Sequence, residues 1–120
     1  MTLNEYQEKA MTTCLPESKN FAYMMLNLTG ELGELASKVA KAIRKDLAFI
    51  DDNYLNFTQD VEERQPLIQE MQKEAGDILW QLSSLCAVMG WSLEDIAQQN
   101  LDKLASRQQR GVIDGSGDNR

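Results

Sequence analysis

Hydrophobic positions along the chain recur at helical spacing in two long segments. In residues 19–45 apolar side chains alternate at intervals of four and three, and residues 66–90 repeat the alternation. The first set comprises Phe21, Met25, Leu28, Leu32, Leu35, Val39 and Ala42. The second comprises Ile68, Met71, Ala75, Ile78, Leu82, Leu85 and Met89. Each set forms an apolar seam along one helix face, so we predict two long helices that pack seam to seam.

Proline and glycine set the limits of the second long helix. Pro66 suits the first helical position, because its missing N–H costs nothing there. Gly90 suits the helix end, where glycine tolerates the left-handed conformation. Residues 46–65 are ambiguous, and we expect a loop, a short helix or both. No segment of the chain has a convincing strand pattern.

Two shorter helices flank the long ones. Thr2 and Glu5 have capping-box spacing and begin a helix over residues 3–14. Ser92, with an acid three residues later, begins a last helix that ends near residue 110. The predicted fold is therefore all-α, a bundle of four to five helices. The seams and the many methionines offer more apolar surface than one small bundle buries, which indicates an oligomer.

Composition limits the class of protein. The 120 residues are 42% apolar with two prolines, which fits one helical domain; we expect it over residues 1–110, followed by a flexible glycine-rich tail over 111–120. A net charge of −7 argues against a nucleic acid polymer as partner, since such binding depends on Lys and Arg. No apolar run approaches the ~18 residues of a membrane span, and no signal-peptide pattern is present. We expect a cytoplasmic protein without a membrane partner.

The chain contains no histidine and two cysteines, which restricts its chemistry. Without histidine, Ser-His and Cys-His nucleophiles and His-ligated metals are excluded. Cys14 and Cys86 are too few and too far apart for a disulfide framework or a zinc site, and Cys86 fits a core position. Any catalysis must use carboxylates, Lys, Arg, amides and hydroxyls.

Each long helix carries two acids three residues apart, with a glycine before the second acid. The segments are GELGEL, with Glu31 and Glu34, and KEAGDI, with Glu74 and Asp77. Every acid lies one residue before a seam position, so seam-to-seam packing brings four carboxylates together at the edge of the interface. Crowded carboxylates are unfavourable, and each helical glycine costs about 1 kcal/mol against alanine. A hard cation such as Mg²⁺, which binds carboxylate and phosphate oxygens, explains this arrangement.

Simpler explanations exist for each part of this pattern. One Glu-x-x-Glu pair on a helix is usually a solvated face. Gly33 and Gly76 would also allow close helix packing without any ligand. The matching offsets in two helices place a metal site on an equal footing with these simpler explanations.

The last helix carries an amide and three cations on one face. They follow one another at intervals of three, four and three: Asn100, Lys103, Arg107 and Arg110. Taken alone, such a face is more typical of a solvated basic face near a helix C-terminus, but it also suits a polyphosphate. In the first long helix Lys41 lies on the side of Glu31 and Glu34, where it would meet phosphate or balance the acids.

These motifs resemble those of the MazG-like all-α nucleoside triphosphate pyrophosphohydrolases. "EYQEKA" is similar to the first helix of that family, and "GELGELASKVAKAIRKD" and "KEAGDILWQL" to its two metal helices. "NLDKLASRQQRG" and "GVIDGSGDNR" resemble the closing helix and tail of short, single-domain members. The resemblance implies the reaction NTP + H₂O → NMP + pyrophosphate. It also implies homodimers or tetramers whose sites are built from paired bundles.

Residue by residue, the resemblance implies a ligand set for Mg²⁺, with Mn²⁺ as a substitute ion. These ligands would be Glu31, Glu34, Glu74 and Asp77. The side chains facing the triphosphate would be Lys41, Asn100, Lys103 and Arg107. In the absence of histidine, the metal would activate water and a carboxylate would take its proton. We assign this role to Glu34, with a purely ligating role as the alternative.

We therefore expect Mg²⁺-dependent hydrolysis of (deoxy)nucleoside triphosphates that clears the nucleotide pool. The nearest alternative keeps the fold but acts on dUTP or phosphoribosyl-ATP. A non-enzymatic alternative is an acidic helical module for metal binding or oligomerisation.

Overall fold

The computed structural model describes residues 1–120 and contains four α-helices, one short 3-10 helix and one β-hairpin. In chain order the elements are α1 (Leu3–Met11), η1 (Pro16–Ser18), α2 (Phe21–Arg44), β1 (Ala48–Asp51), β2 (Tyr54–Phe57), α3 (Val61–Val88) and α4 (Leu93–Arg110). None of the four helices is apolar over enough of its length to span a membrane. The predicted helical fold is confirmed, but the two strands were not predicted.

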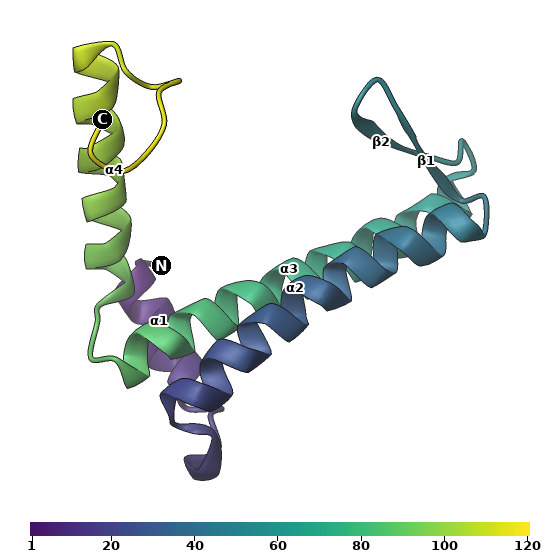
Figure 1. Ribbon diagram of the computed structural model, residues 1–120. Coiled ribbons are helices and arrows are strands. Elements are labelled where there is room, and N and C mark those ends of the chain that lie inside the picture. Colours follow the sequence, from purple (N-terminus) through teal and green to yellow (C-terminus); the bar gives the residue numbers. More distant parts are fainter.

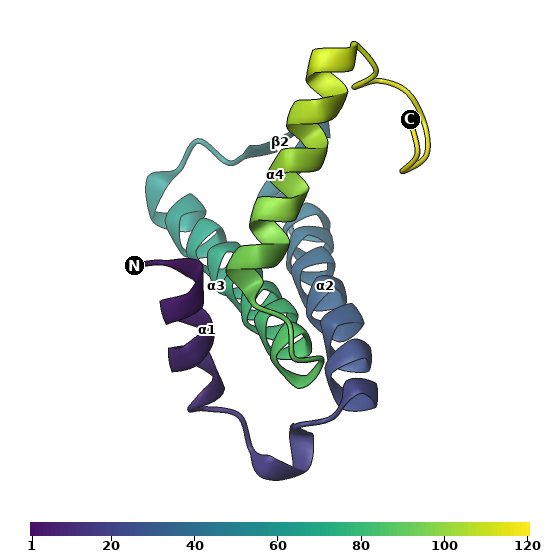
Figure 2. The same ribbon diagram turned by 90° about the vertical axis from the view of Figure 1, so that its left-hand side faces the viewer.

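Helices α2 and α3 run side by side in opposite directions and form a long helix pair (Figure 1). The hairpin β1–β2 joins them at one end. At the other end α1 packs against α3, and α4 rises away from the helix pair (Figures 1 and 2). The radius of gyration is 17.9 Å, whereas a compact chain of this length has about 14 Å. A single chain is therefore an open structure.

A clamp of polar side chains from α1 holds the turn between α3 and α4. The Gln7 side chain donates to the carbonyl of Trp91 (2.9 Å) and accepts from the Leu93 amide (3.0 Å). Ser92, the N-cap of α4, donates its hydroxyl proton to Asn4 (2.7 Å). These bonds use donors and acceptors at the helix end that would otherwise lack partners, and they fix where α4 begins.

The small core lies beneath α1, where the N-terminal end of α2 meets the C-terminal end of α3. Its buried members are Cys14, Met24 and Leu85, and Trp80 packs against them. The Trp80 indole donates to the Ala10 carbonyl (3.2 Å), which anchors α1 on α3. Only 13 of 120 residues are buried, so this core covers a small part of the apolar surface.

The interface between α2 and α3 uses only part of the predicted seam of α2. The buried or half-buried residues of α2 are Met24, Asn27, Leu28, Glu31, Leu35, Lys38, Val39 and Ala42, of which Leu28, Leu35, Val39 and Ala42 were predicted. Phe21, Met25 and Leu32 are exposed, and 59% of Leu32 is accessible. The apolar arc of α2 is wider than one stripe, and α3 covers only one edge of it. The predicted seam is therefore wrong at Phe21, Met25 and Leu32 and confirmed at its other four positions.

Helix α3 shows the same partial agreement. Ile68, Met71, Ile78 and Leu85 of its predicted seam are buried or half-buried, but Ala75 and Leu82 are exposed, and their neighbours Glu74 and Gln81 are buried or half-buried in their place. Polar side chains consequently occupy positions in the helix interface. Gln81 is fully covered and donates to the Met24 sulfur (3.2 Å). The interface is a mixed polar and apolar contact instead of a dry seam.

The beginning of α3 lies five residues before the predicted one. Asp60 is the N-cap and accepts from the Glu62 amide (2.9 Å), and acids fill the first turn. The prediction of Pro66 as the first helical residue is therefore wrong, because Pro66 lies inside the helix. There it removes the hydrogen bond that an N–H would donate to the Glu62 carbonyl. The cap and the acidic first turn stabilise the helix start in spite of this loss.

The hairpin explains part of the ambiguous stretch between residues 46 and 65. Asp52 and Asn53 connect the strands, with φ angles of 48° and 68°. Positive φ at both central residues is the requirement of a type I′ turn, which Asp and Asn tolerate. The register pairs Ile50 with Leu55 and Asp51 with Tyr54.

At the start of the chain, α1 ends at Met11 and not at the predicted residue 14.

Replacing Pro66 by alanine is expected to raise the free energy of unfolding by about 2 kcal/mol. Alanine restores a helical hydrogen bond and relieves the ring clash, worth about 3 kcal/mol, and the freer unfolded chain offsets about 1 kcal/mol of this gain. Urea unfolding followed by circular dichroism measures the change. Gln65→Ala is the matched control, since it improves propensity without adding a backbone donor. A less stable Pro66→Ala protein would contradict this account of α3.

Candidate functional site

Three carboxylates converge between the middle portions of α2 and α3. Glu31 of α2 and Glu74 and Asp77 of α3 each place one oxygen so that all three lie within 4.8 Å of one another. Glu31 and Glu74 are half-buried, and Asp77 is exposed. The expected convergence of acids from the two helices therefore occurs for these three residues. It arises because Glu31 and Glu74 occupy interface positions.

The crowding has an electrostatic consequence for Glu31. Burial, followed by the negative charges of Asp77, Glu74 and Glu34, raises the pKa of the Glu31 carboxyl. The donor set fits a hard divalent cation, since it offers carboxylate oxygens only. Oxygens around Mg²⁺ lie about 3 to 4 Å apart, so small side-chain rotations would bring these three around one ion.

Glu34 lies outside this group of three. It is exposed, one turn beyond Glu31 on α2, and its charge contributes to the raised pKa of Glu31. Glu34 is therefore close enough to act on the cluster electrostatically. Its assigned roles as metal ligand and proton acceptor stay predictions.

Lys38 connects the acidic cluster to a neighbouring ion-pair network. Its ammonium group lies 3.8 Å from a Glu74 oxygen and 3.4 Å from a Glu70 oxygen. Glu70 also pairs with Lys73 at 3.3 Å. Hydrogen bonding and charge from Lys73, and then from Lys38, lower the pKa of Glu70. Glu70 precedes Glu74 by four residues, so the sequence carried a signal for this extension of the acidic stripe.

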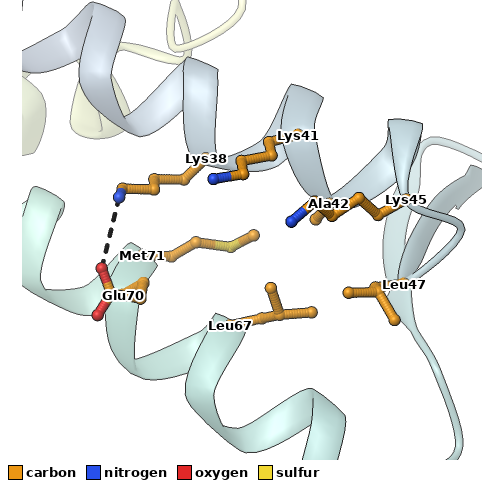
Figure 3. Close-up of a pocket in the computed structure, with 8 residues that line it drawn as sticks. All are labelled: Lys38, Lys41, Ala42, Lys45, Leu47, Leu67, Glu70 and Met71. Atoms are coloured by element: carbon orange, nitrogen blue, oxygen red, sulfur yellow. Dashed lines mark ion pairs between the residues drawn. The ribbon is translucent and has the colours of Figure 1, made fainter.

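A pocket of about 270 Å³ opens beside this network, between α2, α3 and the start of the hairpin (Figure 3). Its polar lining comprises Lys38, Lys41, Lys45 and Glu70. Its apolar lining comprises Ala42, Leu47, Leu67 and Met71. Lys41 and Lys45 have no acidic partner within ion-pair distance, unlike Lys38. The pocket therefore presents two unpaired cations over an apolar floor.

The other predicted phosphate-binding residues lie on α4, which rises away from the α2–α3 pair (Figure 1). Asn100 and Lys103 line a shallow hollow with Ile96 and Gln99. Within one chain, the structure does not bring this face together with the acidic cluster. The sequence-predicted site is thus split into two parts.

Arg107 is buried, with 6% of its side chain exposed, and it pairs with the C-terminal tail. Its guanidinium lies 3.0 Å from an Asp118 oxygen, and the Lys103 ammonium lies 3.3 Å from the same oxygen. Hydrogen bonds from Arg107 and Lys103, with their positive charges, lower the pKa of Asp118. Sequence analysis did not single out Asp118, although it lies within the segment compared with the family tail. The flexibility expected of residues 111–120 stays a prediction.

Tyr6 of α1 is a further neighbour of the acidic cluster that the sequence did not assign. Burial and then the negative charge of Asp77 raise the pKa of the Tyr6 phenol. The contact follows from the packing of α1 on α3, which a single sequence does not reveal.

Gly33 and Gly76 do not serve close packing within the chain. A Cβ built at either position meets no atom within 4 Å other than the backbone of its own helix. Of the two explanations for these glycines, packing between helices of one chain is therefore wrong. The space beside them is open to a ligand or to another copy of the protein.

Comparisons with known proteins place this geometry in a family. The family model described as "MazG nucleotide pyrophosphohydrolase domain" matches residues 19–112, which include both acidic helices and α4. The chain belongs to the MazG nucleotide pyrophosphohydrolase family. Membership of the MazG family indicates nucleoside triphosphate pyrophosphohydrolase activity in general, and it confirms the resemblance seen in the sequence.

A phage protein is also similar to this MazG domain. "Gene 37 protein" of Mycobacterium phage L5 is 37% identical over 103 residues, which cover 85% of this chain and 78% of the phage protein. No solved structure matches the chain.

Divalent metal is expected to stabilise the protein, because an ion bound among the three carboxylates relieves their repulsion and binds only the folded state. Addition of Mg²⁺ or Mn²⁺ should raise the midpoint of thermal unfolding, measured by differential scanning fluorimetry. Glu74→Gln should abolish the shift, and the control Glu8→Gln on α1 should retain it. An equal shift in all three proteins would show that the cluster is not the metal site.

Proposed function

We propose that this protein hydrolyses (deoxy)nucleoside triphosphates to nucleoside monophosphate and pyrophosphate, with Mg²⁺ or Mn²⁺ as cofactor. The observation that carries the proposal is the convergence of Glu31, Glu74 and Asp77 between two helices that the MazG family model covers. The family generally depends on divalent metal ions, and a triad of carboxylates is a fitting donor set.

In this proposal the three converging carboxylates hold the metal, with Glu34 as a fourth ligand or as the proton acceptor. When bound, the ion supplies Lewis acidity toward phosphate oxygens and makes water more acidic. Glu34 is suited to accept the proton of the attacking water, because it is exposed and borders the cluster. Lys38 would keep Glu74 in place through its ion pair.

The lysines beside the pocket would bind the phosphates. Lys41 and Lys45 have free ammonium groups that can stabilise charge on the triphosphate and on the pyrophosphate leaving group. Leu67 and Met71 form an apolar part of the same pocket wall.

A homo-oligomer, dimer or tetramer, is part of this proposal. The accessible surface of the chain is 8626 Å², while a compact monomer of 13.6 kDa has about 6,600 Å². The excess of roughly 2,000 Å² is in the range that obligate interfaces bury. Exposed Phe21, Met25 and Leu32 on α2 and Leu101 on α4 supply apolar contact area.

Oligomerisation would also account for the separation of the two halves of the site. The α4 face of one copy, with Asn100, Lys103 and Arg107, would complete the acidic cluster of another. This arrangement is supported by the open shape of the chain and by the distance of α4 from the helix pair in Figure 1.

The reaction is tested with a panel of ribo- and deoxynucleoside triphosphates, dUTP and phosphoribosyl-ATP, incubated with Mg²⁺ or with chelator. The expected products are monophosphate and pyrophosphate, formed only with the metal. Glu34→Gln should lower kcat by about 10² to 10⁴-fold, the usual contribution of a general base, while Glu8→Gln leaves kcat unchanged. Diphosphate with phosphate as products, or no turnover of any substrate, would overturn the proposal.

Gly76→Ala separates stability from function. Because a methyl group there meets open space in the chain, it should raise the free energy of unfolding by about 1 kcal/mol. It should also lower kcat/KM by about tenfold, since the methyl group misplaces whatever approaches the cluster. Gly30→Ala on α2 gains the same helix stability and should retain activity. Full activity in Gly76→Ala would show that the space has no role.

A further inference from the structure

The C-terminal tail is built around the side chain of its last residue. The Arg120 guanidinium donates to the backbone carbonyls of Val112 (3.0 Å), Ile113 (3.2 Å) and Gly117. A Cβ at Gly115 would lie 2.7 Å from the Arg120 Cδ, so only glycine lets this side chain pass. Residues 111–120 thus close on themselves as a defined loop.

The loop is tied back to α4, as the yellow segment in Figure 1 shows. Gly111 ends the helix in the left-handed conformation, with φ of 71°, and reverses the chain. The Arg110 guanidinium donates to the carbonyl of Arg120 (2.7 Å). This geometry carries Asp118 onto the cationic face of α4.

Asp118 meets two cations that differ in their surroundings. Arg107 is nearly fully buried, its Nε has no hydrogen-bond partner, and Asp118 is its one acidic partner within ion-pair distance. A buried guanidinium is unfavourable without a compensating anion. Asp118 itself is 83% exposed, so it can leave without disrupting a core. Arg107 therefore needs an anionic partner, whereas Asp118 loses no buried contact when it moves away.

We propose that the Asp118 carboxylate occupies the anion position of α4 in place of a substrate phosphate, so that the tail must swing away when polyphosphate binds. The inference rests on the proposed function in one respect, that Lys103 and Arg107 bind phosphate. The Arg107 Nη2 and Lys103 Nζ donors aimed at Asp118 are the groups that a phosphate oxygen would use. A single carboxylate carries less charge than a polyphosphate, which allows replacement.

The glycines of the tail suit this movement. Gly111 and Gly117 have φ angles of 71° and 82°, a region that side-chain-bearing residues rarely adopt. Both lie between α4 and Asp118, with Gly117 directly before it, and they permit backbone rotation on that side of Asp118. The tail acts as an internal competitor for the α4 face.

Asp118→Asn tests the competition directly. Isothermal titration calorimetry with inorganic tripolyphosphate, in metal-free buffer, isolates the cationic face from the acidic cluster. Loss of two ion pairs should tighten binding about fivefold, within the range of exposed pairs. Asp114→Asn removes the same charge from the same tail at a residue with no hydrogen bond or ion pair, and should leave the affinity unchanged.

Gly115→Ala provides an independent variant, because it displaces Arg120 and loosens the loop while keeping Asp118 and every residue of α4. It should also tighten tripolyphosphate binding.

Hydrogen exchange followed by mass spectrometry should show faster exchange of residues 113–119 in the wild type when tripolyphosphate is added. Unchanged or weaker binding in Asp118→Asn, or greater protection of the tail, would overturn the inference.

The outcome is distinct from that of the proposed function. If tripolyphosphate displaces the tail but no nucleotide is hydrolysed, the proposed reaction fails and the competition stands. If nucleotides are hydrolysed and Asp118→Asn binds tripolyphosphate no more tightly than the wild type, only the competition fails.

Discussion

The repulsion among carboxylates in the α2–α3 interface is the constraint on which the rest of the structure depends. Glu31 and Glu74 occupy positions that a simple bundle would give to aliphatic residues, and the raised pKa of Glu31 reflects this. Lys38 offsets part of the repulsion by pairing with Glu74. By taking these interface positions, the charged residues leave much of the apolar surface of α2 without a partner in the same chain.

Two features that look unrelated share this origin. The open shape of the molecule and the exposure of several predicted seam residues are both consistent with an interface that charged groups share with apolar ones. Leu32 becomes exposed because Glu31 takes the inward position. A protein that keeps charges inside its main helix pair needs other surfaces for its stability, and the exposed apolar faces of α2 and α4 are suited to that purpose.

The sequence predicted the features that depend on local periodicity. The four helices, the Ser92 cap and the pairing of two acidic helices were recognisable from spacing and capping residues. The interface residues were predicted only in part, because α2 has apolar residues on two adjacent stripes and tertiary packing decides which of them are covered. The hairpin had a signal in Asp52 and Asn53, two residues that tolerate a type I′ turn, but the strands are too short to show alternation. Asp118 and Tyr6 required knowledge of which segments fold back on which helix.

The polar clamp between α1 and the turn before α4 has a mechanical meaning. Helix α4 is 18 residues long, about 27 Å at 1.5 Å per residue, and it is attached at one end. A rotation of about 5° at Gln7 and Asn4 would move the far end of the helix by about 2 Å, given that length. α4 is therefore a lever whose pivot consists of a few hydrogen bonds in α1. Small movements of α1 therefore produce larger displacements of the cationic side chains near the far end of α4.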